Sequence, residues 1–230
     1  ECDAHTPQIL SRLESADGET RKDLLQLRDG EQVEVVLLRY GRRCSACIST
    51  QIGCACGCAF CATGQMGFVR QLDSNEIASQ ALHVQRELAS QGIQLSNVVL
   101  MGMGEPLLNY EQTMAAIRHL VDQREMGIAP SRVTLSTVGI ADGIERMGEE
   151  GIPIKLAISL HAATDTLRDR LIPINHRYPL AALFTAVELH VALALRRLMY
   201  EWVMIDRVND TQEQAVELAS RLSGMECHVN

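Results

Sequence analysis

The sequence predicts an α/β fold, a partial (β/α)6 barrel, and three observations lead to this fold class. Short apolar runs rich in β-branched residues alternate with longer segments of helical periodicity, as in parallel strands joined by crossover helices. Glycines and polar residues follow several of these runs, at the strand end where barrel enzymes carry their sites. The 230 residues, 47% of them hydrophobic, suffice for one domain with a full core.

The strand and helix patterns can be placed along the chain. The expected strands are residues 33–38, 97–101, 132–136, 154–160, 200–205 and 227–230. The expected helices include residues 75–91, 110–124 and 211–222. Residues that favour turns or loops follow the expected strands at Gly102 and Gly104, at Gly139 and at His161. These positions should therefore meet at the carboxyl-terminal edge of the sheet.

The two ends of the chain are expected to differ from a complete barrel. Residues 1–30 are predicted to be a helical or linker remnant that packs outside the barrel, which takes residues 31–230. The chain begins with Glu1 rather than Met, and its last strand is cut short at Asn230, which indicates an internal piece of a longer protein. No apolar run reaches the roughly 18 residues of a membrane span, so no membrane association is expected.

Cys54, Cys58 and Cys61 form a C-x3-C-x2-C triad within eight residues. Cysteine thiolates are the usual ligands of iron–sulfur clusters, and a protein that supplies three of the four ligands of a [4Fe–4S] cluster leaves one iron open to a small molecule. A zinc site would need a second ligand pair, and none follows Cys61. A disulfide framework fits less well, because eight cysteines in 230 residues is a modest density and no signal-peptide pattern opens the sequence. Three cysteines are interpreted as bystanders: Cys2, Cys44 and Cys56.

Four further runs follow the triad in a fixed order. They are residues 62–68 (ATGQMGF), 101–109 (MGMGEPLLN), 133–139 (VTLSTVG) and 159–162 (SLHA). With the triad, these runs resemble the radical S-adenosylmethionine RNA methyltransferases that act on carbon 2 of adenine, over about residues 27–230. Pro106 after the Gly-Glu pair favours these enzymes over their carbon-8 relatives. The resemblance implies a radical S-adenosylmethionine barrel that binds a [4Fe–4S] cluster and S-adenosyl-L-methionine.

The resemblance assigns cofactor roles to residues that also have ordinary structural interpretations. The triad would hold the cluster, and S-adenosylmethionine would be contacted by Gly104, Glu105, Ser136, Ser159, Leu160 and His161. A Gly-Glu pair after a strand can present main chain and a carboxylate to the ammonium group of this cofactor. Taken alone, the pair is equally a glycine turn with a solvated Glu. Ser136 is then an ordinary strand-end residue, and His161 is a hydrogen-bonded turn histidine.

Glu34 and Cys47, thirteen residues apart, match the family's residues for proton abstraction and for resolving a covalent protein–RNA intermediate. Without the resemblance, Glu34 is the polar member of an alternating strand and faces solvent. The functional interpretation has a chemical reason, because an adenine carbon that has accepted a methylene group must lose a proton to a nearby base. Cys47 would then attack the methyl-carrying sulfur, and thiol–disulfide exchange would separate enzyme from product.

The resemblance also implies a radical mechanism. One S-adenosylmethionine yields a 5′-deoxyadenosyl radical, which takes hydrogen from a methyl group that a second one has placed on a protein cysteine, and the carbon radical adds to adenine. In the family, the methyl-carrying cysteine and an asparagine that binds S-adenosylmethionine lie beyond the strand that begins at Cys227. We therefore expect both to be missing and this piece to be unable to complete methyl transfer, with Cys227 itself structural.

Charge gives only weak support for an RNA partner. The formal net charge is −8, whereas a basic surface is the usual mark of nucleic-acid binding. Residues 35–72 contain no Asp or Glu, so the stretch around the triad is positive, although such runs are often only a solvated face. Its arginines are Arg39, Arg42, Arg43 and Arg70. Aromatic residues that could stack a base, or simply pack the cysteine loop, are Tyr40, Phe60 and Phe68.

The resemblance implies ribosomal RNA, transfer RNA or both as the substrate, an electron donor such as flavodoxin, a monomeric protein and a cytoplasmic location. Two other classes stay open. Another radical S-adenosylmethionine enzyme, such as a glycyl-radical activase or a small-molecule maturase, would share the triad and the Gly-Glu pair but not Glu34, Cys47 and the 159–161 run. A non-catalytic metal-binding remnant would hold zinc, whereas the enzyme class would hold about four irons.

Overall fold

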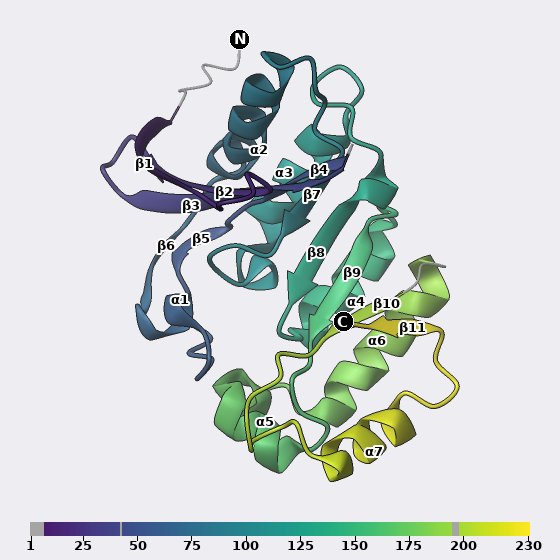
Figure 1. The fold of residues 1–230 in the computed structure, drawn as a ribbon. Helices are drawn as coiled ribbons and strands as arrows, with labels where there is room; N and C mark the ends of the chain where they lie inside the picture. Colours follow the sequence, from purple (N-terminus) through teal and green to yellow (C-terminus); the bar gives the residue numbers. More distant parts are fainter. Residues whose placement is uncertain (1–6, 42, 195–197) are drawn as a thin grey trace.

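The computed structural model describes residues 7–41, 43–194 and 198–230, so Cys2 and Arg42 lie outside the described residues. Its main feature is one curved sheet with helices along the outer side (Figure 1). The parallel strands are β4 (Arg43–Cys47), β7 (Asn97–Leu100), β8 (Val133–Thr137), β9 (Lys155–Ser159), β10 (Leu198–Glu201) and β11 (Cys227–Val229). Antiparallel strands precede them: β1 (Gln8–Glu14), β2 (Thr20–Gln26) and β3 (Gln32–Tyr40). A separate ribbon consists of β5 (Gln51–Gly53) and β6 (Phe68–Gln71).

Helices connect the strands along the described chain. The α-helices are α1 (Ala62–Gln65), α2 (Ser74–Ala89), α3 (Tyr110–Val121), α4 (Ala141–Glu150), α5 (Asp165–Leu171), α6 (Leu180–Ala194) and α7 (Gln212–Arg221). Short 3-10 helices are η1 (Pro106–Asn109), η2 (Pro130–Arg132) and η3 (Pro173–His176). None of the described helices is both long and apolar enough to cross a membrane.

The strand order confirms the predicted partial barrel. The main sheet runs β1-β2-β3-β4-β7-β8-β9-β10-β11, and every neighbouring pair from β4 to β11 is parallel. Each of these parallel pairs needs a crossover, and the helices between the strands supply them. The carboxyl ends of the six parallel strands therefore lie along one edge of the sheet.

Most expected elements are confirmed, with three differences in the strands. The segment expected at 33–38 forms β3, but it pairs antiparallel with both neighbours and is not one of the parallel barrel strands. The segments predicted around residues 97–101, 132–136, 154–160 and 227–230 form β7, β8, β9 and β11, and the predicted helices form α2, α3 and α7. The strand expected at 200–205 instead ends at Glu201 as β10. The first barrel strand, β4, was not predicted, because its sequence RCSAC has small and polar residues where a strand signal needs branched apolar ones.

The helical packing expected for residues 1–30 is wrong for the described part of that segment. β1 and β2 pair antiparallel with each other, and β2 pairs with β3 over seven residues. The alternation that marks β2 is disguised in the sequence, because the buried positions carry Arg21 and Asp23 as well as Leu25. In a sequence, charged residues at buried strand positions look like part of a polar, exposed segment, because their ion-pair partners are not visible there.

These buried charges attach the antiparallel strands to α2. Asp23 accepts hydrogen bonds from Arg12 Nε at 2.7 Å and interacts with His83 Nε2 at 2.9 Å. Arg21 donates Nη2 to Glu87 Oε2 at 2.7 Å. Ligand atoms of Asp23, His83 and Glu87 lie within 4.8 Å of one another, but the two guanidinium groups already neutralise both carboxylates. We therefore interpret the cluster as a salt-bridge network rather than a metal site.

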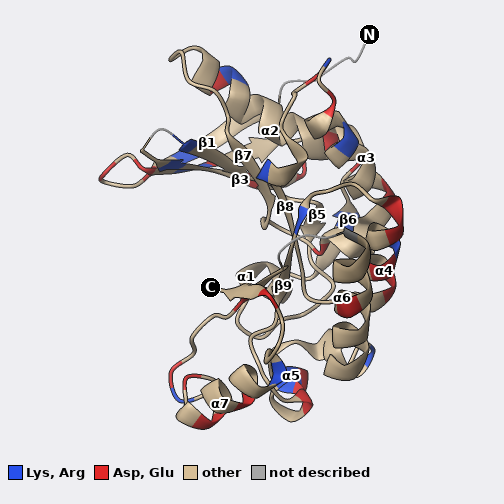
Figure 2. Ribbon diagram, turned by 90° about the vertical axis from the view of Figure 1, so that its right-hand side faces the viewer, with Lys and Arg blue, Asp and Glu red and all other residues tan. Residues whose placement is uncertain are grey.

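Within the described residues, the helices cover one face of the sheet and leave the other free of helices. In Figure 2 the strands lie along the inner side of a C-shaped outline, with α3, α4 and α6 along the outer side. On β3, the odd-numbered Val33, Val35 and Leu37 are buried in the core on the helix side. The even-numbered residues of β3 thus face the inner side, which we call the concave face.

Candidate functional site

The sheet register brings four of the predicted site residues to the concave face. Cys47 pairs with Val36 of β3, so Glu34, two residues earlier, shares its face. Across the sheet, Cys47 aligns with Val99, and Val99 with Thr134. Ser136 and Ser159 continue the same alternation, because Ser136 aligns with Ala157. The Oγ atoms of the two serines lie 3.4 Å apart.

Glu34 lies on the concave face in a partly exposed position. Its side chain is 43% exposed and forms an ion pair with Lys22 Nζ at 2.8 Å. Its carbonyl oxygen accepts a hydrogen bond from Ser49 Oγ at 2.8 Å, which ties this strand to the segment before the triad. The carboxylate is accessible to a ligand on the concave face, and the geometry fits the solvent-facing interpretation equally well.

Cys47 is the last residue of β4 and is only partly exposed. Burial raises the pKa of its thiol to about 11. Because the thiolate is the nucleophilic form, this cysteine needs a base or a rearrangement before it can attack another sulfur. The residue lies on the concave face, and its raised pKa favours the protonated thiol at neutral pH.

The loop that carries the triad leaves the β5–β6 ribbon at Gly53. This glycine has a φ of +72°, and a Cβ there would overlap the carbonyl of Gly67. The amide of Cys54 donates to that same carbonyl at 2.8 Å, and the amide of Cys61 donates to the Cys58 carbonyl at 3.1 Å. These contacts fold the three cysteines into one compact turn that ends in α1.

The triad thiols influence one another electrostatically. Burial, followed by the charges of Cys54 and Cys61, raises the pKa of Cys58 to about 12. A hydrogen bond from the Cys56 thiol lowers the pKa of Cys54 to about 7. Three thiolates crowded in this way repel one another unless cations lie between them, so the donor set fits an iron–sulfur cluster. Cys56 is buried in the same apolar cluster as Cys58, so its expected bystander position stays a prediction.

The Gly-x-Gly-Glu run after β7 packs directly on the base of the cysteine loop. A Cβ on Gly102 would lie 2.5 Å from Ser49 Oγ, and one on Gly104 would lie 2.8 Å from the main-chain N of Gln51. Gly104 also has a φ of +98°, so the position favours glycine on both counts. Met103 O accepts from the Thr50 amide at 2.8 Å, and Gln51 Oε1 accepts from the Glu105 amide at 2.7 Å.

Glu105 differs from the carboxylate expected to face the cofactor's ammonium group. It is 2% exposed, and its two oxygens accept main-chain hydrogen bonds from Leu107 at 3.0 Å and Val138 at 2.8 Å. Burial raises the pKa of this carboxyl to about 7. The side chain therefore joins the start of η1 to the end of β8, and any contact with a ligand would come in addition to these bonds.

The run after β9 presents mainly backbone groups, rather than side chains, at this edge of the sheet. Leu160 is fully buried in the core. His161 has a φ of +56°, and its Nδ1 accepts a hydrogen bond from the Val203 amide at 3.0 Å. Burial, together with the charge of Arg168, lowers the pKa of His161 to about 4, so the ring is neutral. Its ring centroid lies 4.7 Å from that of Phe60. The ring is thus a hydrogen-bonded turn histidine that packs beside the cysteine loop.

Several polar residues that hold this edge together were missed in the sequence. Arg168 is fully buried beneath the ends of β8 and β9. Asn109 Nδ2 donates to the carbonyls of Thr50 and Leu72, both at 2.8 Å. Asn209 Nδ2 donates to the His161 carbonyl at 2.8 Å. Arg168 and Asn209 lie in polar stretches that resemble solvated loops, so only the three-dimensional packing identifies them, whereas Asn109 ends the 101–109 run without a predicted role.

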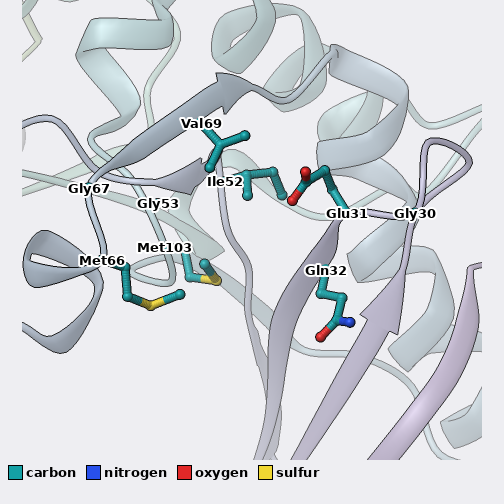
Figure 3. Close-up of a pocket in the computed structure, with 9 residues that line it drawn as sticks. All are labelled: Gly30, Glu31, Gln32, Ile52, Gly53, Met66, Gly67, Val69 and Met103. Carbon is teal, nitrogen blue, oxygen red and sulfur yellow. The ribbon is translucent and has the colours of Figure 1, made fainter.

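A shallow pocket lies beside the cysteine loop but holds none of the predicted residues (Figure 3). Its lining comes from the turn before β3, the β5–β6 ribbon and the loop after β7: Gly30, Glu31, Gln32, Ile52, Gly53, Met66, Gly67, Val69 and Met103. Met66 and Val69 are largely exposed, so the pocket is an open apolar surface rather than an enclosed site.

The arginines expected near the triad that the structure describes do not form one patch. Arg70 is paired with Asp29 and Glu76, each at 2.7 Å. Arg39 donates to Gln91 Oε1 at 3.3 Å, on the helix side of the sheet. Arg43 is exposed on the concave side, in register with the 59% exposed Tyr40. Phe68 is also exposed, whereas Phe60 packs on the turn histidine.

Comparison with known proteins finds close relatives of this chain. A dual-specificity RNA methyltransferase of Myxococcus xanthus, RlmN 1, is 51% identical over 216 residues, which are 94% of this chain and 60% of that protein. A probable dual-specificity RNA methyltransferase RlmN of Moorella thermoacetica is 49% identical over 228 residues, 97% of this chain and 64% of that protein. This chain thus spans about 60% of the length of these curated relatives.

The architecture matches as closely as the sequence. A crystal structure of a radical SAM methyltransferase from Sphaerobacter thermophilus superimposes with a TM-score of 0.95 at 43% sequence identity, over 98% of this chain and 66% of that one. Residues 48–219, more than half of the chain, match the Radical SAM superfamily, whose members use the two predicted cofactors, a [4Fe–4S] cluster and S-adenosylmethionine. The chain therefore belongs to the radical SAM superfamily.

Proposed function

We propose that this chain is the catalytic barrel of an RNA methyltransferase that adds a methyl group to carbon 2 of adenine through a methyl-cysteine intermediate. The substrate would be ribosomal RNA, transfer RNA or both, in a reduced cytoplasm with flavodoxin or a similar electron donor. The relatives named as dual-specificity RNA methyltransferases support the reaction class. The predicted residues support its chemistry.

Each predicted residue has a role in this proposal. Cys54, Cys58 and Cys61 would hold the cluster, which with S-adenosylmethionine supplies the radical that carbon 2 of adenine requires. The second cofactor would lie over the ends of β7, β8 and β9, against Gly104, Glu105, Ser136, Ser159, Leu160 and His161. Glu34 would take the proton from the methylated ring carbon, and Cys47 would attack the methyl-carrying sulfur.

One observation carries the proposal. The register places Glu34, Cys47, Ser136 and Ser159 on the same concave face, although 125 positions separate the first from the last. That face is free of helices in the described chain, and the packing of the Gly-x-Gly-Glu run brings its edge to the base of the cysteine loop. A carboxylate, a thiol and two hydroxyls therefore share one surface, and its edge adjoins the base of the cysteine loop.

The distribution of charge also accommodates RNA better than the net charge does. Acidic residues gather on the outer helices in Figure 2, and α4 alone carries Asp142, Glu145, Glu149 and Glu150. The concave face instead carries Lys22 and Arg43 beside Glu34. A polyanion that approaches from the concave side therefore avoids most of the negative charge.

The cofactor assignment can be tested with cysteine variants. The chain is purified anaerobically, reconstituted with iron and sulfide, and assayed for metal content in the wild type and in C54A, C58A and C61A. Cys56→Ala is the matched control, because Cys56 lies in the same loop but outside the C-x3-C-x2-C spacing. We expect about four irons per chain in the wild type and the control, and a loss of iron in each triad variant. Zinc in place of iron, or equal loss in the control, would contradict the assignment.

The reaction itself is tested by adding S-adenosylmethionine, a reductant and RNA to the reconstituted chain. Formation of 5′-deoxyadenosine is expected, and any methyl group that reaches RNA should be at carbon 2 of adenine and should depend on Glu34 and Cys47. Nucleoside mass spectrometry identifies the position. Methylation elsewhere would refute the adenine carbon-2 assignment, and an absence of 5′-deoxyadenosine would refute the radical chemistry.

A further inference from the structure

Arg168 is a buried cation whose hydrogen bonds converge on the main chain at the edge of the barrel. Its Nε donates to the Leu160 carbonyl at 3.2 Å, and its Nη2 donates to the Ser159 carbonyl at 3.2 Å. The same Nη2 also donates to the carbonyl of Val138. One guanidinium thus fixes the chain where β8 and β9 both end.

The remaining donor of Arg168 orients it from below. Nη1 donates to Asn175 Oδ1 at 2.7 Å, and Asn175 Nδ2 in turn donates to Asp165 at 2.9 Å and Asp169 at 2.6 Å. No carboxylate bonds directly to the guanidinium among the described residues. Its charge is therefore offset through an amide, and its forked geometry is used for carbonyl groups rather than for an ion pair.

Val138 links this cation to the Gly-Glu run. Its N–H is held by the Glu105 carboxylate and its carbonyl by Arg168. A buried carboxylate therefore accepts from the N–H of Val138, and a buried guanidinium donates to its carbonyl. Gly139, the next residue, has a φ of +104° and lies against Leu183, so the turn has little freedom to shift.

The segments that Arg168 holds are the ones proposed to bind S-adenosylmethionine. Ser159 and Leu160 are bonded through their own carbonyls, and Ser136 lies two residues before Val138. The left-handed backbone of His161 follows immediately. Arg168 also lies close enough to Cys58 to interact with it electrostatically.

We propose that Arg168 is a positioning residue for the cofactor edge, which sets the spacing of the β8 and β9 ends so that their main chain and serines can bind S-adenosylmethionine beside the cluster. The inference rests on the proposed function, since it needs that edge to be the cofactor site. It goes beyond the predicted ligand residues, because Arg168 acts through carbonyl groups and touches no ligand itself.

The test separates the effect of the guanidinium's several hydrogen bonds from the effect of its positive charge. Arg168→Lys keeps the positive charge but cannot reach the three carbonyls together. Arg170→Lys, at an exposed position on the same helix, is the matched control. Each variant is reconstituted and compared with the wild type for iron content, thermal unfolding and S-adenosylmethionine affinity by equilibrium dialysis. Hydrogen exchange at residues 138–139 and 160–162 is measured without cofactor.

We expect R168K to retain its iron, to bind S-adenosylmethionine at least about tenfold more weakly, and to exchange these amides faster. R170K should match the wild type. Wild-type affinity and wild-type exchange in a folded R168K would overturn the inference, because charge alone would then suffice. Should R168K fail to fold, Asn175→Ala decides instead, because it keeps the guanidinium but removes the partner of Nη1. S-adenosylmethionine should then bind several-fold more weakly. Unchanged binding would refute the proposal. If the wild type itself binds neither iron nor S-adenosylmethionine, the proposed function fails rather than this inference.

Discussion

Two buried charge clusters in this protein are built on opposite principles. Beside α2, Arg12, Arg21, Asp23 and Glu87 bond mainly to one another, and the network attaches β1 and β2 to the barrel. At the cofactor edge, Glu105 and Arg168 bond to main-chain groups instead. Charges that pair with each other join elements, whereas charges that bond to the backbone determine where the ends of strands lie. The second kind is what a ligand site at those ends requires.

The largest effect should come from breaking the self-paired cluster. Asp23→Asn removes the buried carboxylate that Arg12, Arg21 and His83 share, although both guanidinium groups keep Glu87, so the free energy of unfolding should fall by about 3–4 kcal/mol. S-adenosylmethionine affinity should not change, because the cluster lies on the α2 side of the sheet. Urea unfolding measures the first quantity and equilibrium dialysis the second.

Asp210→Asn is the control for this experiment, since Asp210 is exposed. A D23N protein that stays within about 1 kcal/mol of the wild type would show that the network is not a major source of stability. Weakened cofactor binding at normal iron content would show that the two clusters are coupled, against the comparison drawn above.

A pH effect is expected from the cofactor edge. The folded-state pKa of His161 is about 4, below its ordinary value of 6.5, so the folded protein binds this proton less tightly than the unfolded chain. The associated stability is fully present above pH 6.5 and is lost as the pH falls toward 4, by about 3 kcal/mol at most. Unfolding free energies measured from pH 4 to 8 should show this loss.

His161→Asn provides the reference, because Asn accepts a hydrogen bond, tolerates a positive φ and does not titrate. The wild type should lose more stability than H161N between pH 6.5 and 4, the window between the two pKa values. Parallel curves for the two proteins would mean that the histidine is not held neutral at this edge.

A smaller effect should follow from adding a side chain where Gly104 packs closely against Gln51. Gly104→Ala introduces a Cβ at 2.8 Å from the Gln51 main-chain N, in addition to the strain of a φ of +98°. Gly30→Ala shares the strain, with a φ of +90°, but meets nothing within 4 Å. We expect Gly30→Ala to cost about 1 kcal/mol and Gly104→Ala about 2 kcal/mol in total. Equal costs would show that the close approach is not needed.

The smallest effect is expected on the concave face. Lys22 and Glu34 are 41% and 43% exposed, so their ion pair should contribute no more than about 1 kcal/mol. Glu34→Gln should therefore leave the unfolding free energy nearly unchanged. A stability loss well above this, seen in urea unfolding, would assign Glu34 a structural role and weaken its assignment as a base.

The sequence predicted the barrel well, because β7, β8 and β9 are short apolar runs with glycine or serine at their ends. It missed β4 and the β1–β2 pair, whose buried positions carry small or charged residues. The register places Glu34 and Cys47 on one face of the sheet, and their catalytic roles stay predictions. The bonds of Glu105 and Arg168 could not be predicted, because they depend on backbone groups that only the folded sheet brings together.

The central claim is that the three thiols of the cysteine loop and the adjoining strand ends form one site for a cluster and S-adenosylmethionine. Electron paramagnetic resonance of the reduced, reconstituted chain tests it most directly. The account predicts a [4Fe–4S] signal whose g-values change when S-adenosylmethionine is added, because the cofactor binds the iron without a cysteine. A signal that does not respond to S-adenosylmethionine, or no cluster signal at all, would contradict it.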